Sequence, residues 1–312
     1  MQAADMSDIN HSVSITAPAK INLVLEILGS DAEGYHLLST VFQALELADD
    51  LTLTRASETS LELINNFSTG LKIETGADNL AVKAQKNLEA YCQKELPCRI
   101  KLVKNIPAGG GLGGGSADAA AVLKGLNALY GLGLSEKEML SAAARLGADV
   151  SFGILGGTAL GSGRGEQLSP LPAVLPEYQV MLVIPSQGLS TPQVYSHWDA
   201  MDPQKRSPAR RKAERFVKAA QSPHPQDAEL LAALSNDLQP AAFELYPELA
   251  EIRSAMLQSG CAAAMLCGSG STMFGLIPPH SDSDQTEAVK QKLSPWGQVT
   301  VTKFSRFRSI PR

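Results

Sequence analysis

The sequence has few cysteines, few histidines and no excess of positive charge. Its four cysteines fall into two Cys-x5-Cys pairs rather than the Cys-x2-Cys spacing of zinc sites, and its five histidines are scattered. We therefore expect reduced thiols and neither a disulfide framework nor a metal site built from protein ligands. Acidic residues (32) outnumber basic ones (27), which argues against a general nucleic-acid binder because no overall positive field would neutralise phosphates. An anionic ligand must be held by local groups.

Long apolar runs are also absent. No run approaches the ~18 residues that a membrane-spanning helix needs. The first ten residues, MQAADMSDIN, contain no basic segment followed by an apolar one, so we expect a cytoplasmic protein with no membrane partner. A length of 312 residues suffices for two domains, and 44% hydrophobic with 19% charged residues is typical of a globular protein. The oligomeric state is left open.

The periodicity of apolar residues predicts an α+β protein. Strand-like patterns occupy residues 20–27, 50–54, 60–64, 99–103, 178–184, 263–266 and 298–304. Helical patterns occupy residues 79–94, 116–131, 135–146, 248–259 and 285–293, with a capping box at Ser135–Glu138 and a C-terminal stop at Gly147. We place a domain boundary between residues 168 and 169. The basic stretch within residues 199–226 is interpreted as a solvated helix or loop, with binding of an anionic partner as the alternative.

The strongest local signal is a run of six glycines within residues 109–115, between a predicted strand and a predicted helix. Glycine at this density is costly unless the backbone needs positive φ or approaches another group closely. Successive amides that open onto a helix N-terminus form a cradle for phosphate oxygens, whereas a hinge or tight turn is the plainer alternative. The predicted phosphate-binding residues are Pro107, Ala108, Gly109, Gly110, Gly111, Leu112, Gly113, Gly114, Gly115, Ser116 and Ala117.

Three common phosphate-binding classes can be excluded. Gly109-x-Gly111-x-x-Gly114 matches the dinucleotide fingerprint formally, but a second helix follows and no acidic residue ends a strand about 20 residues on. No Gly-Lys-Ser or Gly-Lys-Thr closes the run, which excludes the nucleotide-triphosphatase loop. The His-Arg-Asp and Asp-Phe-Gly elements of protein kinases are missing as well.

Three other segments carry residues that are unusual for their surroundings. Lys20 heads an otherwise apolar strand, where a lone lysine would usually extend to solvent. Asp149 follows a predicted helix C-terminus, where a carboxylate is disfavoured and needs a partner to stay ionised, although a turn-forming role is the simpler interpretation. Residues 267–271, Cys-Gly-Ser-Gly-Ser, follow an apolar strand as a tight turn whose small residues would also let substrate and phosphate approach.

Together and in this order, the segments resemble the GHMP kinase superfamily, the small-molecule kinases named for galactose, homoserine, mevalonate and phosphomevalonate. The resemblance spans most of the chain and is carried by residues 17–23, 31–36, 107–117, 146–152, 191–195, 236–238 and 268–271. It implies a two-domain fold, with a first domain (1–168) like ribosomal protein S5 domain 2 and a ferredoxin-like second domain (169–312). The site would lie in the cleft between them.

The resemblance also implies a reaction: transfer of the γ-phosphoryl group of ATP to an alcohol, which depends mainly on positioning and charge stabilisation. Asp149 would take the hydroxyl proton, and Lys20 would pair with Asp149 near the transferring phosphoryl group. A nearby ammonium keeps such a carboxylate ionised. Residues 107–117 would wrap the triphosphate, and Mg²⁺ would bridge its oxygens.

The Gly34-Tyr35-His36 element is specific, within the superfamily, to kinases of the non-mevalonate isoprenoid pathway, whose substrate is diphosphocytidyl-methylerythritol and whose acceptor is its 2-hydroxyl. The resemblance nominates Tyr35 and Tyr195 as plates that stack on cytosine and His36 for the base edge. Thr191 would lie nearby and Asn22 would hydrogen-bond substrate. The alternatives are another kinase of the superfamily, acting on homoserine or a mevalonate derivative, and a non-catalytic ligand-sensing relative.

Overall fold

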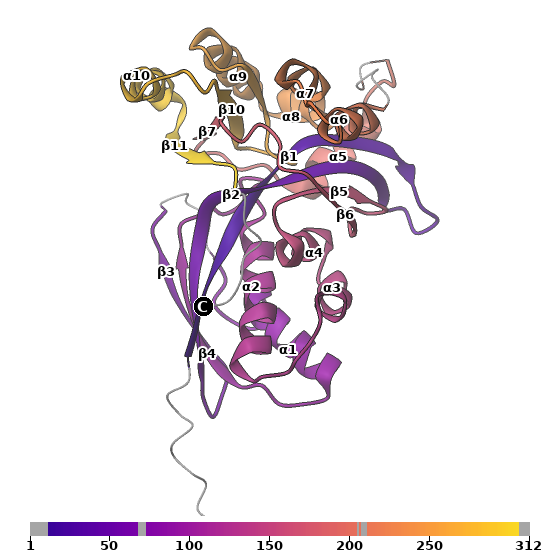
Figure 1. The fold of residues 1–312 in the computed structure, drawn as a ribbon, viewed down its shortest axis with the longest axis vertical. Helices are drawn as coiled ribbons and strands as arrows, with labels where there is room; N and C mark the ends of the chain where they lie inside the picture. Colours follow the sequence, from indigo (N-terminus) through magenta and orange to yellow (C-terminus); the bar gives the residue numbers. More distant parts are fainter. Residues whose placement is uncertain (1–11, 68–72, 205, 207–210, 306–312) are drawn as a thin grey trace, which may run out of the picture.

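The computed structural model describes residues 12–67, 73–204, 206 and 211–305, arranged around two β-sheets (Figure 1). The first sheet has the order β3-β4-β2-β1-β8, with β5 paired to β2 and β6 to β5. Its strands are β1 (Ser12–Ser30), β2 (His36–Arg55), β3 (Ser60–Asn65), β4 (Cys98–Lys104), β5 (Thr158–Ser162), β6 (Gln167–Leu171) and β8 (Ser235–Asn236). The second sheet is antiparallel, in the order β11-β7-β10-β9, with β7 (Gln179–Ile184), β9 (Ala263–Leu266), β10 (Met273–Ile277) and β11 (Gln298–Lys303).

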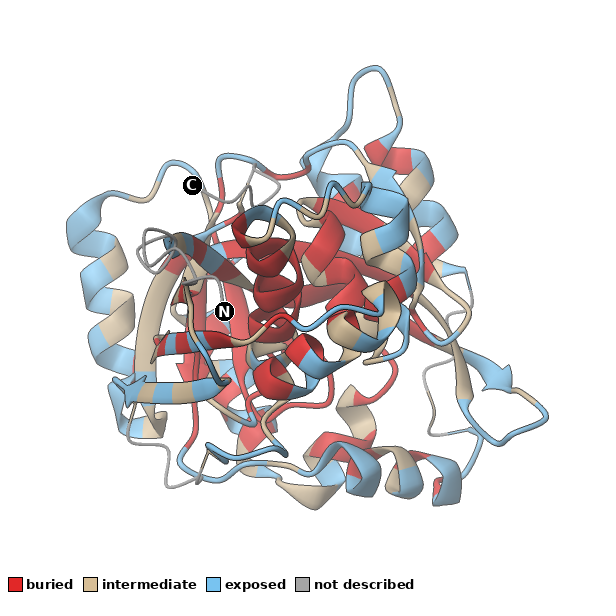
Figure 2. Cartoon of the chain, turned by 90° about the horizontal axis from the view of Figure 1, so that it is seen from below, coloured by how far each residue is buried: buried red, intermediate tan, exposed pale blue. Residues whose placement is uncertain are grey.

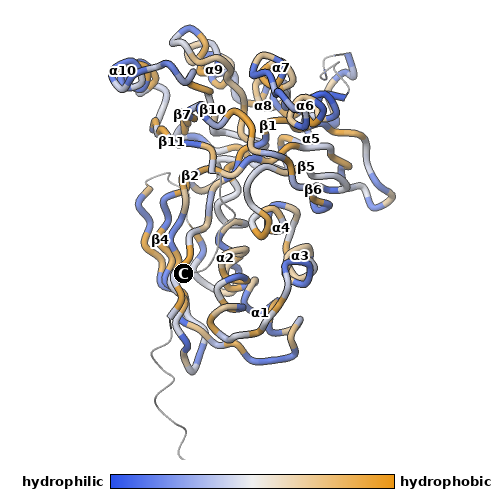
Figure 3. Tube along the Cα trace, viewed as in Figure 1, coloured by the Kyte–Doolittle hydropathy of each residue, from blue (hydrophilic) through white to orange (hydrophobic). Residues whose placement is uncertain are grey.

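Helices separate into two groups along the chain. With the first sheet lie α1 (Leu80–Cys92), α2 (Gly114–Leu129), α3 (Glu136–Ala144) and α4 (Ala148–Leu155) (Figure 1). The second half contributes α5 (Thr191–Ala200), α6 (Lys212–Ala220), α7 (Asp227–Ala233), α8 (Gln239–Leu245), α9 (Glu248–Gln258), α10 (Ser283–Leu293) and the 3-10 helix η2 (Ser294–Trp296). Figure 3 shows that hydrophilic residues concentrate in outer helices such as α10. Among the described residues, no helix combines the length and apolarity needed to cross a membrane.

Helix α2 is the central helix of the first half, and nearly all of it is buried. Its alanines let it pack closely on α1 and β1, and at Gly125 a Cβ would lie only 2.0 Å from Leu53 Cδ1, so a larger residue there would displace this buried leucine side chain. Buried residues gather in the middle of the molecule, whereas the peripheral helices keep exposed faces (Figure 2). This packing fixes the start of α2, where the glycine-rich segment ends.

The expected strands and helices are present, and the capping box at Ser135–Glu138 is confirmed. Some boundaries are wrong. Strand β1 begins at Ser12, so Lys20 lies in the middle of a long strand and not at its head, and β2 begins at His36 rather than near residue 50. In addition, α3 ends at Ala144, and Gly147, with φ of 144°, precedes α4 instead of stopping the previous helix. Asp149 therefore lies in the first turn of a helix and not beyond a C-terminus. A glycine between two short helices marks either end equally well, which explains the error.

Other predictions concern segments that are only partly described. Residues 1–10, Lys205 and Arg210 lie outside the described residues, while the remainder of the basic stretch includes α6. The boundary at residues 168 and 169 stays a prediction. Contacts across it include the parallel pairing of β8 with β1 and the bridge of Phe304 to Leu45.

Candidate active site

The glycine-rich segment leaves β4 and enters α2 directly. Gly109, Gly111 and Gly113 have φ of 72°, 78° and 70°, a left-handed conformation that disfavours other residues. Gly113 caps α2 without any side-chain hydrogen bond. The first amides of α2 therefore face the loop's interior, at the positive end of the helix dipole, where an anion is stabilised.

Close contacts explain two of these glycines. A Cβ on Gly111 would lie 2.0 Å from the carbonyl oxygen of Cys267, and a Cβ on Gly113 would lie 3.0 Å from Lys20 Cε. The Lys20 amide also donates to Leu112 O at 2.9 Å. The glycine segment is thus held between β1 and the turn at residues 267–271.

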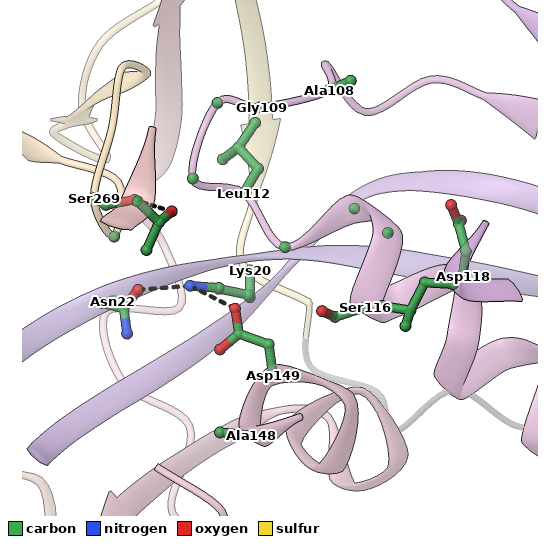
Figure 4. Close-up of a pocket in the computed structure, with 18 of the residues that line it drawn as sticks. Lys20, Asn22, Ala108, Gly109, Leu112, Ser116, Asp118, Ala148, Asp149 and Ser269 are labelled. Carbon is green, nitrogen blue, oxygen red and sulfur yellow. Dashed lines mark hydrogen bonds and ion pairs between the residues drawn. The ribbon is translucent and has the colours of Figure 1, made fainter. Parts of the chain in front are cut away.

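Lys20 and Asp149, which are far apart in the sequence, face each other across this site (Figure 4). Lys20 Nζ lies 3.3 Å from Asp149 Oδ2 and donates to Asn22 Oδ1 at 2.8 Å. Asn22 is fixed in turn, because its Nδ2 donates to Thr40 Oγ1 at 2.8 Å. Lys20 is only 7% exposed, whereas the side chain of Asp149 is 36% exposed. The pair consists of a buried ammonium and a carboxylate that a ligand can reach.

Asp149 has two sources of stabilisation for its negative charge. It lies in the first turn of α4, where the helix dipole favours an anion, and it faces the ammonium of Lys20. The sequence predicts that Asp149 follows a helix C-terminus, where the helix dipole would destabilise its charge. Asp149 instead lies at a helix N-terminus, so the dipole and the ammonium of Lys20 both stabilise the carboxylate.

A cavity of about 610 Å³ joins these groups. Residues 107–116 border it together with Lys20, Asn22 and Asp149 from the first half, and Thr191, Tyr195 and Ser269 from the second. Ala117 lies behind it, buried, with its amide donating to Gly113 O at 2.9 Å. Thr191 Oγ1 and Ser269 Oγ are 2.7 Å apart. Both halves of the chain are needed to enclose a ligand.

The aromatic residues that the family resemblance assigns to cytosine lie in two different places. The ring of His36 packs on Tyr195 at 4.8 Å between centroids, and His36 Nε2 lies 2.9 Å from Asp199 Oδ1. Burial, together with the nearby charge of Asp149, raises the pKa of Tyr195 to about 12, so its hydroxyl keeps its proton. Tyr35 is 58% exposed and has the guanidinium of Arg164 over its ring at 4.0 Å. The structure brings His36 and Tyr195 together, with Tyr35 on a separate turn.

A second lysine cluster, centred on Lys104, is not predicted by the sequence. Lys104 Nζ donates to Asp118 Oδ2 at 2.6 Å and to Asp49 Oδ2, and all three side chains are buried. Asp49 Oδ1 also accepts the amide of Ile106 at 2.7 Å, at the start of the glycine segment. Figure 4 places Asp118 farther along α2, away from Lys20 and Asp149. The available signal was an acidic residue inside the alanine-rich face of α2.

In this cluster two buried carboxyl groups share the single ammonium of Lys104. Burial, reinforced by the carboxylate of Asp49, outweighs the attraction of Lys104 and raises the pKa of Asp118 to about 8. Burial opposes the charge of Lys104, but the two carboxylates outweigh it and raise the pKa of that ammonium. Asp118 Oδ1 finds no hydrogen-bond partner among the described residues.

Asn236 lies in a segment that carries the family resemblance, but the sequence predicts no role for it. Its side chain supports the turn at residues 267–271. Asn236 Nδ2 donates to Leu266 O at 3.0 Å and to Gly268 O at 2.7 Å, while its Oδ1 accepts the amide of Leu238. Asn236 therefore links β8 and α8 to the turn that packs on Gly111.

Comparison with known proteins defines the class. The family model for the GHMP kinases N terminal domain matches residues 79–158, and that for the GHMP kinases C terminal matches residues 216–294. A homoserine kinase from Cytophaga hutchinsonii shares the fold, with a TM-score of 0.74 at 17% identity and coverage of 100% of both chains. The chain is a GHMP kinase, so the predicted superfamily and fold class are confirmed.

Sequence relatives narrow the family. A protein from Moorella thermoacetica named 4-diphosphocytidyl-2-C-methyl-D-erythritol kinase is 41% identical over 92% of this chain and 99% of its own length. One of the same name from Acaryochloris marina is 36% identical over 94% and 97%. A crystal structure of 4-(cytidine 5'-diphospho)-2C-methyl-D-erythritol kinase superposes with a TM-score of 0.73 at 33% identity, covering 94% of this chain and 99% of that chain. Within the GHMP kinases, the chain belongs to the 4-diphosphocytidyl-2-C-methyl-D-erythritol kinase family.

Proposed function

We propose that this enzyme transfers the γ-phosphoryl group of ATP to the 2-hydroxyl of 4-diphosphocytidyl-2-C-methyl-D-erythritol, a reaction of the non-mevalonate isoprenoid precursor pathway. The observation that carries the proposal is the 3.3 Å pair of Lys20 and Asp149 beside a glycine segment whose amides open into the same cavity. Family membership supplies the substrate. The cytoplasmic location stays a prediction.

The residues divide the work of phosphoryl transfer, which needs positioning and stabilisation of charge more than covalent chemistry. Amides of residues 109–116 hold the triphosphate at the positive end of α2. Asp149 accepts the proton of the attacking hydroxyl. Lys20 keeps Asp149 ionised and faces the charge that develops on the transferring group.

The cavity also fits Mg²⁺ held mainly by ATP. The described residues contain no group of three or more His, Cys, Asp or Glu side chains that could hold a metal. Magnesium in such enzymes is bound by phosphates with one or two protein oxygens, and the hydroxyl of Ser116 borders the cavity at the start of α2. Ser116 would hold the ion together with the phosphates, and the ion would supply charge neutralisation of phosphate oxygens.

The substrate would occupy the cavity between Asn22 and the second half of the chain. Asn22, fixed by Thr40, is placed to hydrogen-bond the alcohol, and Thr191 borders the same space. Tyr195 and His36 offer one aromatic wall for cytosine, and Tyr35 a second plate on the neighbouring turn.

Steady-state kinetics test the proposal directly. We expect turnover with the cytidylylated alcohol and none with homoserine or mevalonate. Asp149→Asn should lower kcat by about 10² to 10⁴-fold, the usual range for a lost general base, with ATP affinity retained. Turnover of homoserine or mevalonate in preference to the cytidylylated alcohol would overturn the assignment, and an Asp149→Asn enzyme with unchanged kcat would remove the role of Asp149.

A further inference from the structure

Arg164 lies in the turn between β5 and β6 and reaches the tip of the β1–β2 hairpin, residues 31–35. Its Nε and Nη2 lie 2.7 and 2.6 Å from Asp31 Oδ2, and Nη2 also donates to Glu33 Oε2 at 2.6 Å. The guanidinium carbon stands 4.0 Å from the centre of the Tyr35 ring. The same residue borders the cavity that contains Lys20 and Asp149. One side chain therefore connects two turns, covers an aromatic ring and adjoins the candidate active site.

The hairpin tip is shaped to present Tyr35. Asp31 Oδ1 accepts the amides of Glu33 and Tyr35 at 2.9 and 3.0 Å, and Gly34 has φ of 86°. One carboxylate oxygen of Asp31 thus folds the tip internally, and the other binds Arg164. In Figure 1 this tip projects outward past β5 and β6. Because an isolated two-stranded hairpin is only marginally stable, the contacts with Arg164 help to hold the tip in place.

The turn that carries Arg164 also packs beside Asp149. The amide of Leu38 donates to Gly163 O at 2.7 Å, and a Cβ on Gly165 would lie 3.3 Å from the Cβ of Ala148, the first residue of α4. Arg164 therefore sets the position of Tyr35 relative to the helix that carries Asp149.

We propose that Arg164 is a positioning residue for the nucleoside end of the substrate: it holds Tyr35 with one ring face under the guanidinium and the other face available to stack on cytosine. The inference rests on the proposed function. Tyr35 remains 58% exposed although Arg164 covers it, so a ring face is open to a ligand. A ring ordered before the ligand arrives saves the entropy of ordering it on binding.

The chemistry requires arginine rather than lysine. A planar guanidinium stacks on a ring and bridges two carboxylates at once, whereas an ammonium is a compact point charge. Arg164→Met removes both functions, and Arg164→Lys keeps the charge but loses the planar stacking. Arg55, whose guanidinium lies 4.9 Å from the ring of Tyr130, offers a matched control with a similar contact elsewhere.

Kinetics of these variants test the inference. We expect Arg164→Met to raise KM for the cytidylylated alcohol about tenfold and Arg164→Lys about threefold, in line with cation–π contacts, with kcat and KM for ATP nearly unchanged. Arg55→Met should leave KM for the alcohol unchanged. In a Tyr35→Ala background, Arg164→Met should add little, because the ring that it positions is gone.

Three outcomes would overturn the inference: an unchanged KM for the alcohol, an equal rise in KM for ATP, or additive effects of Arg164→Met and Tyr35→Ala. If Arg164→Met does not fold, as judged by thermal melting, Arg164→Lys carries the same comparison. A wild-type enzyme without turnover of the cytidylylated alcohol would instead refute the proposed function, so the two failures are distinguishable.

Discussion

Lys20 and Lys104 both border the cavity, and each contacts two oxygen-bearing side chains. Lys20 contacts the neutral amide of Asn22 and the partly exposed carboxylate of Asp149. Lys104 contacts the carboxylates of Asp49 and Asp118, both buried. One cluster balances one positive with one negative charge, and the other places two carboxylates on a single ammonium.

The difference separates a site that can act on a ligand from one that supports it. Asp149 is reachable from the cavity and faces a single ammonium, which suits a group that must accept a proton. The Lys104 cluster is buried, and the second carboxylate oxygen of Asp49 accepts hydrogen bonds from the amides of Asn105 and Ile106, just before the glycine segment. Accessibility and charge balance, rather than residue type, distinguish the two lysines.

Replacing each lysine by methionine should give the largest contrast. Lys104→Met leaves the buried carboxylate of Asp49 without its cation and removes a hydrogen-bond donor from Asp118, which should reduce the free energy of unfolding by about 3–5 kcal/mol. Lys20→Met should instead lower kcat by about 10² to 10³-fold, since it removes charge stabilisation at the reacting groups, with a smaller loss of stability. Urea unfolding and steady-state kinetics on both variants measure this contrast. Equal losses of stability and of kcat in the two variants would erase the distinction between the clusters.

The two clusters also show what could be predicted from the sequence. The glycine run is rare enough to be informative by itself, and Lys20 is conspicuous within an apolar strand, although it lies in the middle of β1 and not at its head. The sequence also indicates Asp149 as a candidate residue. It predicts the wrong end of a helix for it, because Gly147 could end one helix or begin another.

The rest depends on tertiary contacts. Lys104 ends a strand, where a single charge is ordinary. Asp118 stands out on the alanine-rich face of α2, but nothing local indicates that its partner is Lys104 or that both meet Asp49. Arg164 occupies a partly exposed turn, and its contact with Tyr35 requires two hairpins to come together.

Converting the first cluster into the charge pattern of the second gives an intermediate effect. In Asn22→Asp, Lys20 would face two carboxylates, and the hydrogen bond from Nδ2 to Thr40 would be lost. We expect a loss of about 1–3 kcal/mol of stability, because a buried polar group loses its partner. KM for the alcohol should rise about tenfold, the equivalent of one hydrogen bond to substrate. Asn22→Ser, which removes the amide without adding charge, is the control. If the Asp and Ser variants behave alike, the added carboxylate has no effect of its own.

The reverse conversion, Asp118→Asn, gives Lys104 one carboxylate and one amide, and its effect should appear in how stability changes with pH. Burial raises the pKa of Asp118 from 3.8 to about 8, so the folded state holds this proton more tightly than the unfolded chain. The resulting stabilisation is complete below about pH 4, decreases as the pH rises and is lost above about pH 8. The pKa of Lys104 is raised from its ordinary value of 10.5, so titration of this group affects stability only at higher pH. Between pH 5 and 8 the wild type should therefore lose stability relative to the variant, by at most about 1.4 kcal/mol per pH unit, since asparagine does not titrate.

Urea unfolding of both proteins at intervals across this range measures the difference. Parallel profiles would mean that Asp118 is already ionised and that the buried cluster tolerates its excess negative charge.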